Sequence, residues 1–153
     1  MAKNFKDAFN NIKKLVDKLT DKSNMEKVGE ETVKMVRKRT QLGYGSNKGK
    51  KEKLEALSDA YKKQRKRLKK KGKLSKNTSA GKSNLTQSGD MLKDLDFDAK
   101  DNEVTIDFAS ELSKKKAVWV TDGDRPFLAL TKQEIKRITK YLQDMADKLI
   151  KKS

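Results

Sequence analysis

The side chains best suited to bind a ligand are a dense group of lysines and arginines in the middle of the chain. Residues 48–82 contain 15 Lys or Arg against three acids, a net charge of +12 in a chain whose formal net charge is +17. Such a block typically contacts phosphate or an acidic protein surface, and the alternative is a solvated, disordered loop. The residues expected to contact DNA or an acidic partner are Lys62, Lys63, Arg65, Lys66, Arg67, Lys69, Lys70 and Lys71.

A second candidate is Arg125, which precedes the only proline of the chain, Pro126. Proline restricts the residue before it to extended backbone, so the guanidinium of Arg125 is expected at a rigid corner. There it could form a bidentate contact with a carboxylate of a neighbouring subunit or with a phosphate. The alternative is a clamp within the chain, with Asp122, Asp124 or Glu134 as the partner.

The residue types needed for most catalytic chemistry are missing. The chain has no cysteine and no histidine, which excludes thiol catalysis, disulfides, histidine-based acid–base chemistry and zinc fingers. Leu85–Leu92 lacks the glycine spacing and the Lys-Ser/Thr ending of a phosphate-binding loop. The sequence therefore predicts no enzyme, no cofactor and no metal site. Five aspartates in the second half of the chain lack the spacing of a calcium-binding loop, and we interpret them as the solvent face of a hairpin. They are Asp94, Asp96, Asp98, Asp101 and Asp107.

Aromatic residues are scarce near the basic block. Tyr44 and Tyr61 are too few to build a stacking channel for single-stranded nucleic acid. Trp119, the only tryptophan, is expected to be half-buried in the core rather than to stack on a base.

Two helices are expected before the basic block. Ser23 and Glu26 form a capping-box pattern for the second helix, which should bury Val28, Val33 and Val36 and end near residue 40. The first helix is predicted over residues 3–19 because apolar residues recur there at spacings of three and four. These residues are Phe5, Phe9, Ile12, Leu15, Val16 and Leu19.

The middle of the chain is expected to be an insertion over residues 41–84. Three glycines between residues 41 and 50 predict a loop. Residues 69–84 are mostly Lys, Gly, Ser, Asn and Thr, which is typical of a mobile linker. Between them a third helix is predicted, with Ser58 as a possible cap. The residues that follow its helical spacing are Leu54, Leu57, Tyr61, Arg65 and Leu68.

Alternating apolar and polar residues predict four short antiparallel strands in the second half of the chain. Two form a hairpin around a turn at residues 100–102, and the others are Ala117–Val120 and Phe127–Leu130, separated by a turn at 122–124. Thr131 and Glu134 form a capping box for a C-terminal helix. The apolar face of that helix consists of Ile135, Ile138, Leu142, Met145, Leu149 and Ile150.

The sequence thus predicts one α+β domain over residues 1–153, made of two N-terminal helices, the basic insertion, a small antiparallel sheet of about four strands, and a C-terminal helix. Hydrophobic residues make up 33% of the chain and charged residues 40%, so the core should be small and oligomerisation is expected to stabilise it. No apolar run reaches the roughly 20 residues needed to span a membrane, and the N-terminus lacks the apolar core of a signal peptide. We therefore expect no membrane partner, and the absence of cysteine fits synthesis in the cytoplasm.

The order of four short motifs resembles the virion-morphogenesis proteins of tailed bacteriophages, a family of tail-completion, neck and head–tail joining proteins. In that family a leucine-threonine-x-threonine/serine-glycine-x-leucine segment precedes a hairpin, and an arginine-proline-phenylalanine strand leads into a C-terminal helix. The resemblance covers roughly residues 26–150. The motifs are Thr40–Gly45 (TQLGYG), Leu57–Tyr61 followed by Arg65, Ser83–Leu92 (SNLTQSGDML) and Arg125–Leu130 (RPFLAL).

The resemblance implies a structural virion protein that forms a homo-oligomeric ring, a hexamer or dodecamer, around the DNA channel. Its neighbours would be the portal or adaptor protein on one side and tail proteins on the other, with non-specific contact to packaged double-stranded DNA. The subunit interface is expected to include Arg125, Phe127 and Trp119. Two alternatives stay open: a free nucleic-acid-binding protein that uses the basic helix, and a transient assembly factor that leaves before maturation.

Overall fold

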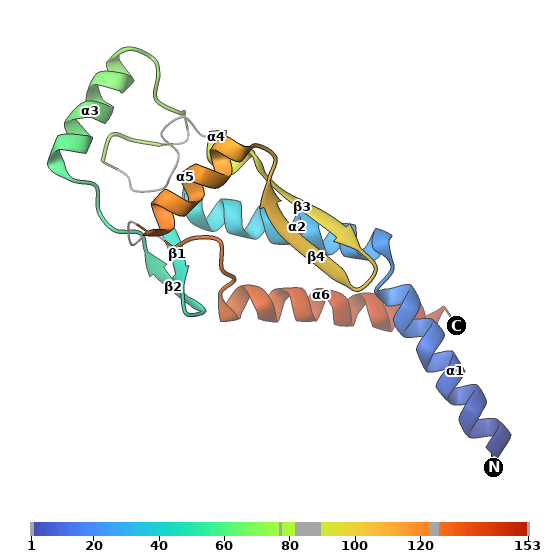
Figure 1. Cartoon of the computed structure of the whole chain (residues 1–153). Coiled ribbons are helices and arrows are strands. Elements are labelled where there is room, and N and C mark those ends of the chain that lie inside the picture. Colours follow the sequence, from blue (N-terminus) through green and yellow to red (C-terminus); the bar gives the residue numbers. More distant parts are fainter. Residues whose placement is uncertain (1, 77, 82–89, 123–125, 153) are drawn as a thin grey trace.

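The computed structural model describes residues 2–76, 78–81, 90–122 and 126–152 (Figure 1). These residues form an α+β fold of six helices and two antiparallel two-stranded sheets, which confirms the predicted fold class. In chain order the elements are α1 (Ala2–Leu19), α2 (Lys22–Gln41), β1 (Tyr44–Asn47), β2 (Lys50–Lys53), α3 (Asp59–Lys70), α4 (Asp90–Lys93), β3 (Leu95–Lys100), β4 (Glu103–Phe108), α5 (Glu111–Asp122) and α6 (Lys132–Lys151).

The two N-terminal helices are confirmed, but α2 is capped by a different residue from the one predicted. The carboxylate of Asp21 accepts a hydrogen bond from the backbone N–H of Asn24 at 2.8 Å, and α2 begins at Lys22. Ser23 therefore lies inside the first turn and is not the cap. An aspartate at the cap satisfies a free N–H and also places negative charge at the positive end of the helix, which a serine does not.

The loop expected over residues 41–50 is wrong, because this segment enters a hairpin. Strand β1 pairs with β2 in the register that places Asn47 opposite Lys50. The turn between them consists of Lys48 and Gly49, whose φ angles are both positive, at 48° and 77°. A two-residue turn with left-handed backbone matches the twist of the flanking strands. Gly49 therefore builds a tight turn between two strands where a loop was predicted.

The second hairpin, β3–β4, matches the prediction. Leu95 lies opposite Phe108, and the turn is closed by Asn102 with a φ of 67°. Helix α2 packs against both strands. A Cβ atom on Gly29 of α2 would lie 2.3 Å from the ring of Phe97, so glycine at this position lets the helix approach the strand closely.

The predicted strand Ala117–Val120 is wrong, because these residues belong to helix α5. Ser113 and Ala117 are buried and Val120 is partly buried, whereas Val118 and Trp119 are exposed. The buried positions recur at spacings of four and three, which is the period of a helix and not the alternation of a strand. The period becomes visible only when Ser113 is counted on the buried face, and a serine gives no hydrophobic signal.

The predicted fourth strand, Phe127–Leu130, is also wrong. In this irregular segment the backbone carbonyls of Phe127 and Ala129 accept hydrogen bonds from the side chain of Arg39 rather than from a neighbouring strand. Because a side chain occupies these acceptors, a sheet ladder cannot use them.

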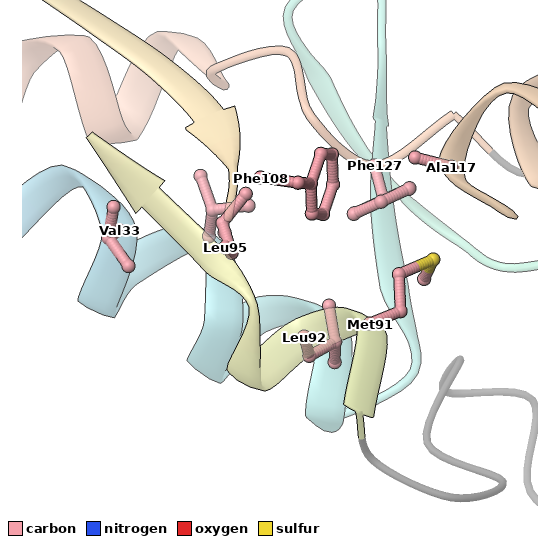
Figure 2. Close-up of a cluster of buried hydrophobic side chains, with 8 residues drawn as sticks. Val33, Met91, Leu92, Leu95, Phe108, Ala117 and Phe127 are labelled. Carbon is pink, nitrogen blue, oxygen red and sulfur yellow. The ribbon is translucent and has the colours of Figure 1, made fainter. Parts of the chain in front are cut away.

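The main core lies where α2, α4, the β3–β4 hairpin, α5 and Phe127 meet (Figure 2). It consists of Val33, Val36, Met91, Leu92, Leu95, Phe108, Ala117 and Phe127. A second cluster of Met25, Val28 and Ala99 reaches α6 through Ile138, Tyr141 and Leu142. The predicted burial of Val28, Val33 and Val36 is thus confirmed. Within the described ranges 13 hydrophobic residues are buried, which agrees with the small core expected from composition.

Helix α6 begins with the predicted capping box. The hydroxyl of Thr131 accepts from the backbone N–H of Glu134 at 3.2 Å, and the Glu134 carboxylate accepts from the backbone N–H of Thr131 at 2.8 Å. From this start α6 packs against α2, and it also contacts α1, which projects away from the rest of the molecule (Figure 1). Both ends of the apolar face of α6 remain exposed, at Ile135 and Ile150.

Candidate assembly surfaces

A buried arginine near the end of α2 holds the segment that leads into α6. The guanidinium of Arg39 donates to the carboxylate of Glu134 and to the backbone carbonyl of Phe127. It also donates to the carbonyl of Ala129 at 3.1 Å. Burial lowers the pKa of Arg39 from its ordinary value, and the charge and hydrogen bond of Glu134 oppose that shift. One guanidinium therefore joins α2, the segment before α6, and α6 itself.

The sequence assigned this corner to a different arginine. Arg125 and Asp124, one of its predicted partners, lie outside the described residues. Another predicted partner, Glu134, is bound by Arg39. The signal for Arg39 was its position three residues after the buried Val36, on the apolar face of α2. An arginine on that face requires a buried carboxylate, because an unpaired buried charge is strongly destabilising.

The segment after Arg125 also lies against the first hairpin. The backbone N–H of Ser46 donates to the carbonyl of Pro126 at 3.0 Å, and the N–H of Lys132 donates to the carbonyl of Gly49 at 2.9 Å. A Cβ on Gly45 would lie 2.1 Å from the Pro126 carbonyl oxygen, so this approach requires glycine. Phe127, which was expected at a subunit interface, is fully buried in the core of the single chain. Its ring is therefore not presented to a partner.

The predicted basic helix is α3, and the hydroxyl of Ser58 caps it by accepting from the backbone N–H of Tyr61 at 3.3 Å. Figure 1 shows α3 at the opposite end of the molecule from α1. Lys62 is partly buried and pairs with Asp59 at 3.4 Å. The predicted contact residues that are exposed on and after α3 are Lys63, Lys66, Arg67, Lys69, Lys70 and Lys71.

Arg65 does not belong to this exposed group, although the sequence placed it there. It is only 2% exposed, and its guanidinium donates to the hydroxyl of Thr78 at 2.8 Å and lies 5.9 Å from the centre of the Tyr61 ring. Burial lowers the pKa of Arg65, and the charge of Tyr61 opposes this. Arg65 therefore packs the segment after α3 against the helix instead of reaching a partner.

Trp119 is exposed, not half-buried as predicted. Its exposed fraction is 67%, and Leu112 and Val118 of the same helix are also largely exposed. Because α5 turns Ser113 and Ala117 towards the core, these three apolar side chains are left on the outside. The outer surface of α5 is therefore accessible to a partner at Trp119, one of the predicted interface residues.

A larger apolar surface lies between α1 and α6. An open groove of about 230 Å³ is lined only by apolar residues, which are Ile12, Leu15, Val16, Leu19, Ala146, Leu149 and Ile150. Phe9 and Ile12 of α1 are each 60% exposed. An amphipathic helix whose apolar face stays in water usually buries that face against another molecule.

The face of the β3–β4 hairpin that points away from the core is strongly acidic. Asp96, Asp98 and Asp107 are exposed, and Asp96 lies directly opposite Asp107 in the strand register. Lys114 of α5 pairs with Asp107 at 3.0 Å, and Lys100 approaches Asp98 at 3.9 Å. Like charges at directly opposed positions destabilise a strand pair, so this face has unneutralised negative charge.

Asp94 has a different role from the other carboxylates of this region. One oxygen of its carboxylate accepts hydrogen bonds from the hydroxyls of Ser110 and Ser113, each at 2.6 Å. These two bonds lower the pKa of Asp94. Ser110 in turn accepts from the backbone N–H of Ser113 at 3.3 Å, at the start of α5. Asp94 therefore fixes the start of α5, and it does not belong to the exposed acidic face.

The described residues contain no group of three or more carboxylates placed to hold a metal ion. Among the helices in the described ranges, none combines the length and the apolar character that crossing a membrane requires. Comparison with known proteins adds no relative: no protein-family model matches the chain, and neither a curated protein nor a solved structure is significantly similar to it.

Proposed function

We propose that this chain is a non-enzymatic structural virion protein of a tailed phage, which assembles into a neck or tail-completion ring between the portal or adaptor and the tail. The assembly role rests chiefly on the apolar face shared by α1 and α6, which the single chain leaves in water. The phage setting rests on the order of the four sequence motifs, which resembles that of virion-morphogenesis proteins.

The chemistry of the rest of the molecule supports an assembly role. The core of the described part is small, and oligomerisation stabilises chains of this kind because each interface buries surface that one copy leaves exposed. The exposed apolar residues of α5 offer a further surface of the same character. The two hairpins each have only two strands, and their open edges could pair with other subunits.

The competing function is sequence-independent binding of double-stranded DNA. The observation that favours it is the group of exposed lysines along α3. Phosphate contacts of this kind carry no sequence information and make affinity fall steeply with salt, by about 0.9 in log–log slope for each phosphate neutralised. A ring subunit could also touch the DNA in the channel, so the competing function is that of a free DNA-binding protein that is not part of the particle.

The experiment that separates them is quantitative mass spectrometry of purified phage particles, with the portal protein as an internal standard of copy number. A fixed ratio that corresponds to one ring per particle supports the neck role. Absence from particles, with abundant protein in infected cells, contradicts it and favours free nucleic-acid binding. Presence in immature particles alone points to a transient assembly factor.

A further inference from the structure

The two extremes of charge in this chain lie on separate elements. Residues 90–111 contain eight carboxylates against two lysines, a net charge of −6, although the whole chain is at +17. Residues 48–82 hold the net charge of +12. Figure 1 shows α3, which has exposed lysines at positions 63, 66, 69 and 70, well separated from the β3–β4 hairpin of the same copy. Each copy therefore presents a basic helix and an acidic sheet face that it does not bring together itself.

The acidic face is an unpartnered sheet surface. Helix α2 packs against the hairpin on its apolar side. The exposed side chains on the other side are four carboxylates, one lysine and one threonine, which are Asp96, Asp98, Lys100, Glu103, Thr105 and Asp107. Among the described residues, the repulsion between Asp96 and Asp107 is relieved by Lys114, which pairs with Asp107 and leaves Asp96 without a paired cation. A lysine from outside would remove the remaining repulsion, so this face favours a cationic partner.

Helix α3 has the complementary chemistry and size. Lys63, Lys66 and Lys70 recur at spacings of three and four, so they form one exposed stripe along the helix. A helix of 12 residues is about 18 Å long, and a strand of six residues is about 20 Å long. The stripe from Lys63 to Lys70 covers about 10 Å of the helix and Asp96 to Asp98 about 7 Å of the strand, so the stripe is long enough to reach both carboxylates.

We propose that α3 of one copy docks on the outer face of the β3–β4 hairpin of a second copy, with Lys63, Lys66 and Lys70 against Asp96 and Asp98. This contact joins two different surfaces, so each copy can engage two neighbours, and repetition of one such contact closes a ring or extends a filament. Of the functional proposal above, the inference requires only that copies of the chain assemble.

A protein partner is favoured over DNA for this helix because every added copy brings an acidic face in equal number with the basic one. In an assembly the two surfaces are held near each other, which raises their effective concentration above that of a free ligand. Charge complementarity of this kind selects the partner surface and speeds encounter.

The test is a pair of charge reversals in the full chain, at residues that are all exposed. One variant reverses the helix with Lys63→Glu, Lys66→Glu and Lys70→Glu, and the other reverses the hairpin with Asp96→Lys and Asp98→Lys. Self-association is measured by sedimentation velocity and native mass spectrometry at low salt (about 0.05 M) and high salt (about 0.5 M), because screening weakens exposed ion pairs. Circular dichroism checks that each variant keeps its fold.

The wild-type chain is expected to associate more strongly at low salt than at high salt, because salt screens this ionic contact. Each variant alone should associate about 100-fold more weakly, because the altered helix or hairpin then faces a surface of the same charge. Repulsion of this kind costs several kcal/mol, and about 1.4 kcal/mol changes the Kd tenfold. A mixture of the two variants should recover wild-type association, since a reversed helix then meets a reversed hairpin and an unchanged helix meets an unchanged hairpin. A chain that combines all five substitutions should also recover it.

Two matched controls change net charge by the same amounts elsewhere. Lys27→Glu, Lys34→Glu and Lys38→Glu match the helix variant, and Glu26→Lys with Glu30→Lys match the hairpin variant, all at exposed positions of α2. The controls should associate like the wild type.

Several outcomes overturn the proposal. A wild-type chain that stays monomeric, or variants that associate normally, leaves no role for this contact. Loss of association in the helix variant alone, with no recovery in the mixture, means that α3 binds something other than the hairpin. Duplex DNA that binds the wild type and not the helix variant then identifies nucleic acid as the partner. Because these measurements need no phage particle, their failure is distinguishable from failure of the neck assignment.

Discussion

The guanidinium of Arg39 is buried together with the carboxylate of Glu134. This ion pair fixes the position of the backbone segment that precedes α6. The carbonyls of Phe127 and Ala129 accept from the same guanidinium, so the backbone before α6 is fixed by a side chain and not by a sheet. A buried ion pair is not in itself a gain over apolar packing, but loss of one partner is costly because the other charge stays buried alone.

Arg39→Met is expected to lower the free energy of unfolding by about 3–5 kcal/mol, because it leaves Glu134 buried without its cation. Chemical denaturation monitored by circular dichroism measures this. Combining Arg39→Met with Glu134→Gln should recover part of the loss, because the uncompensated charge is then removed. A loss below about 1 kcal/mol in the single variant would show that water reaches this corner.

A second residue-scale prediction concerns Asp94, whose pKa is lowered by the hydroxyls of Ser110 and Ser113. A group whose pKa is lower in the folded state stabilises the fold above its unfolded pKa, near 3.8, and loses that contribution as pH falls through the lower folded value. The stability difference between the wild type and Asp94→Asn should therefore be largest above pH 3.8 and shrink as the pH falls further. Thermal unfolding at a series of pH values measures it.

The matched variant for Asp94 is Ser113→Ala, which removes one of the two hydroxyl donors. It should give a smaller difference from the wild type, with the same pH trend. If Asp94→Asn differs from the wild type by the same amount at all pH values, ionisation of Asp94 does not contribute to the stability.

At the scale of elements, the packing of α2 on the β3–β4 hairpin depends on one glycine. Gly29 lies in the middle of α2, where glycine is about 1 kcal/mol less favourable than alanine. A Cβ at this position would meet the ring of Phe97 at 2.3 Å, closer than real contacts allow. The close approach of helix and strand therefore outweighs the helix propensity that alanine would add.

Gly29→Ala is expected to destabilise the fold by up to about 2 kcal/mol, since overpacking costs about 1–3 kcal/mol and the gain in helix propensity offsets about 1 kcal/mol. Denaturant unfolding measures the change. Gly81→Ala is the control, because no atom of the described residues beyond its chain neighbours lies within 4 Å of the added methyl group, and it should change stability by no more than about 0.5 kcal/mol. A stabilised Gly29→Ala variant would mean that the Phe97 ring moves aside at little cost.

The elements that the sequence predicted correctly have a local cause. The capping box of Thr131 and Glu134, the cap at Ser58 and the turn before Glu103 are each built by neighbours in the chain. The failure at the predicted fourth strand has a distant cause. Phe127–Leu130 reads as a strand, but its carbonyls are bound by Arg39, which is about 90 residues away. No local pattern could show that.

The candidate surfaces also include features that the sequence showed and features that only the folded chain shows. The positive charge of α3 and the negative charge of the hairpin were visible in composition, and the structure leaves most of those side chains exposed. Burial of Arg65 depends on Thr78, a contact across a turn that spacing along a helix does not reveal. Exposure of Trp119 follows from the helical geometry of α5, whose buried face begins with Ser113.

At the scale of the whole molecule, the apolar residues of α1 are distributed for a partner and not for the core of one copy. Helix α1 contacts α6, and its N-terminal half extends beyond that contact (Figure 1). Phe9 and Ile12 are largely exposed, whereas Leu15 and Leu19 are partly buried. The exposed N-terminal part of this apolar face can be buried only by contact with another molecule, and that burial would stabilise the helix.

Phe9→Gln combined with Ile12→Gln should therefore leave the stability of the monomer within about 0.5 kcal/mol of the wild type and should weaken self-association. Thermal unfolding at low concentration measures the first, and sedimentation equilibrium measures the second. Asn10→Gln with Asn11→Gln, at exposed positions of the same turn, is the matched control and should not affect association. Unchanged association in the first variant would contradict a role for this face.

The ion pair between Arg39 and Glu134 joins positions 95 residues apart, and the basic helix lies inside the closed loop. During synthesis, α2 leaves the ribosome long before α6 exists, so the corner between them cannot close until most of the chain has been made. Contacts this distant are also slow to form, because the chain must first lose the entropy of the intervening loop. A chain whose translation stops before Glu134 therefore lacks the carboxylate that pairs with Arg39. Proteases can degrade such a chain before it enters an assembly.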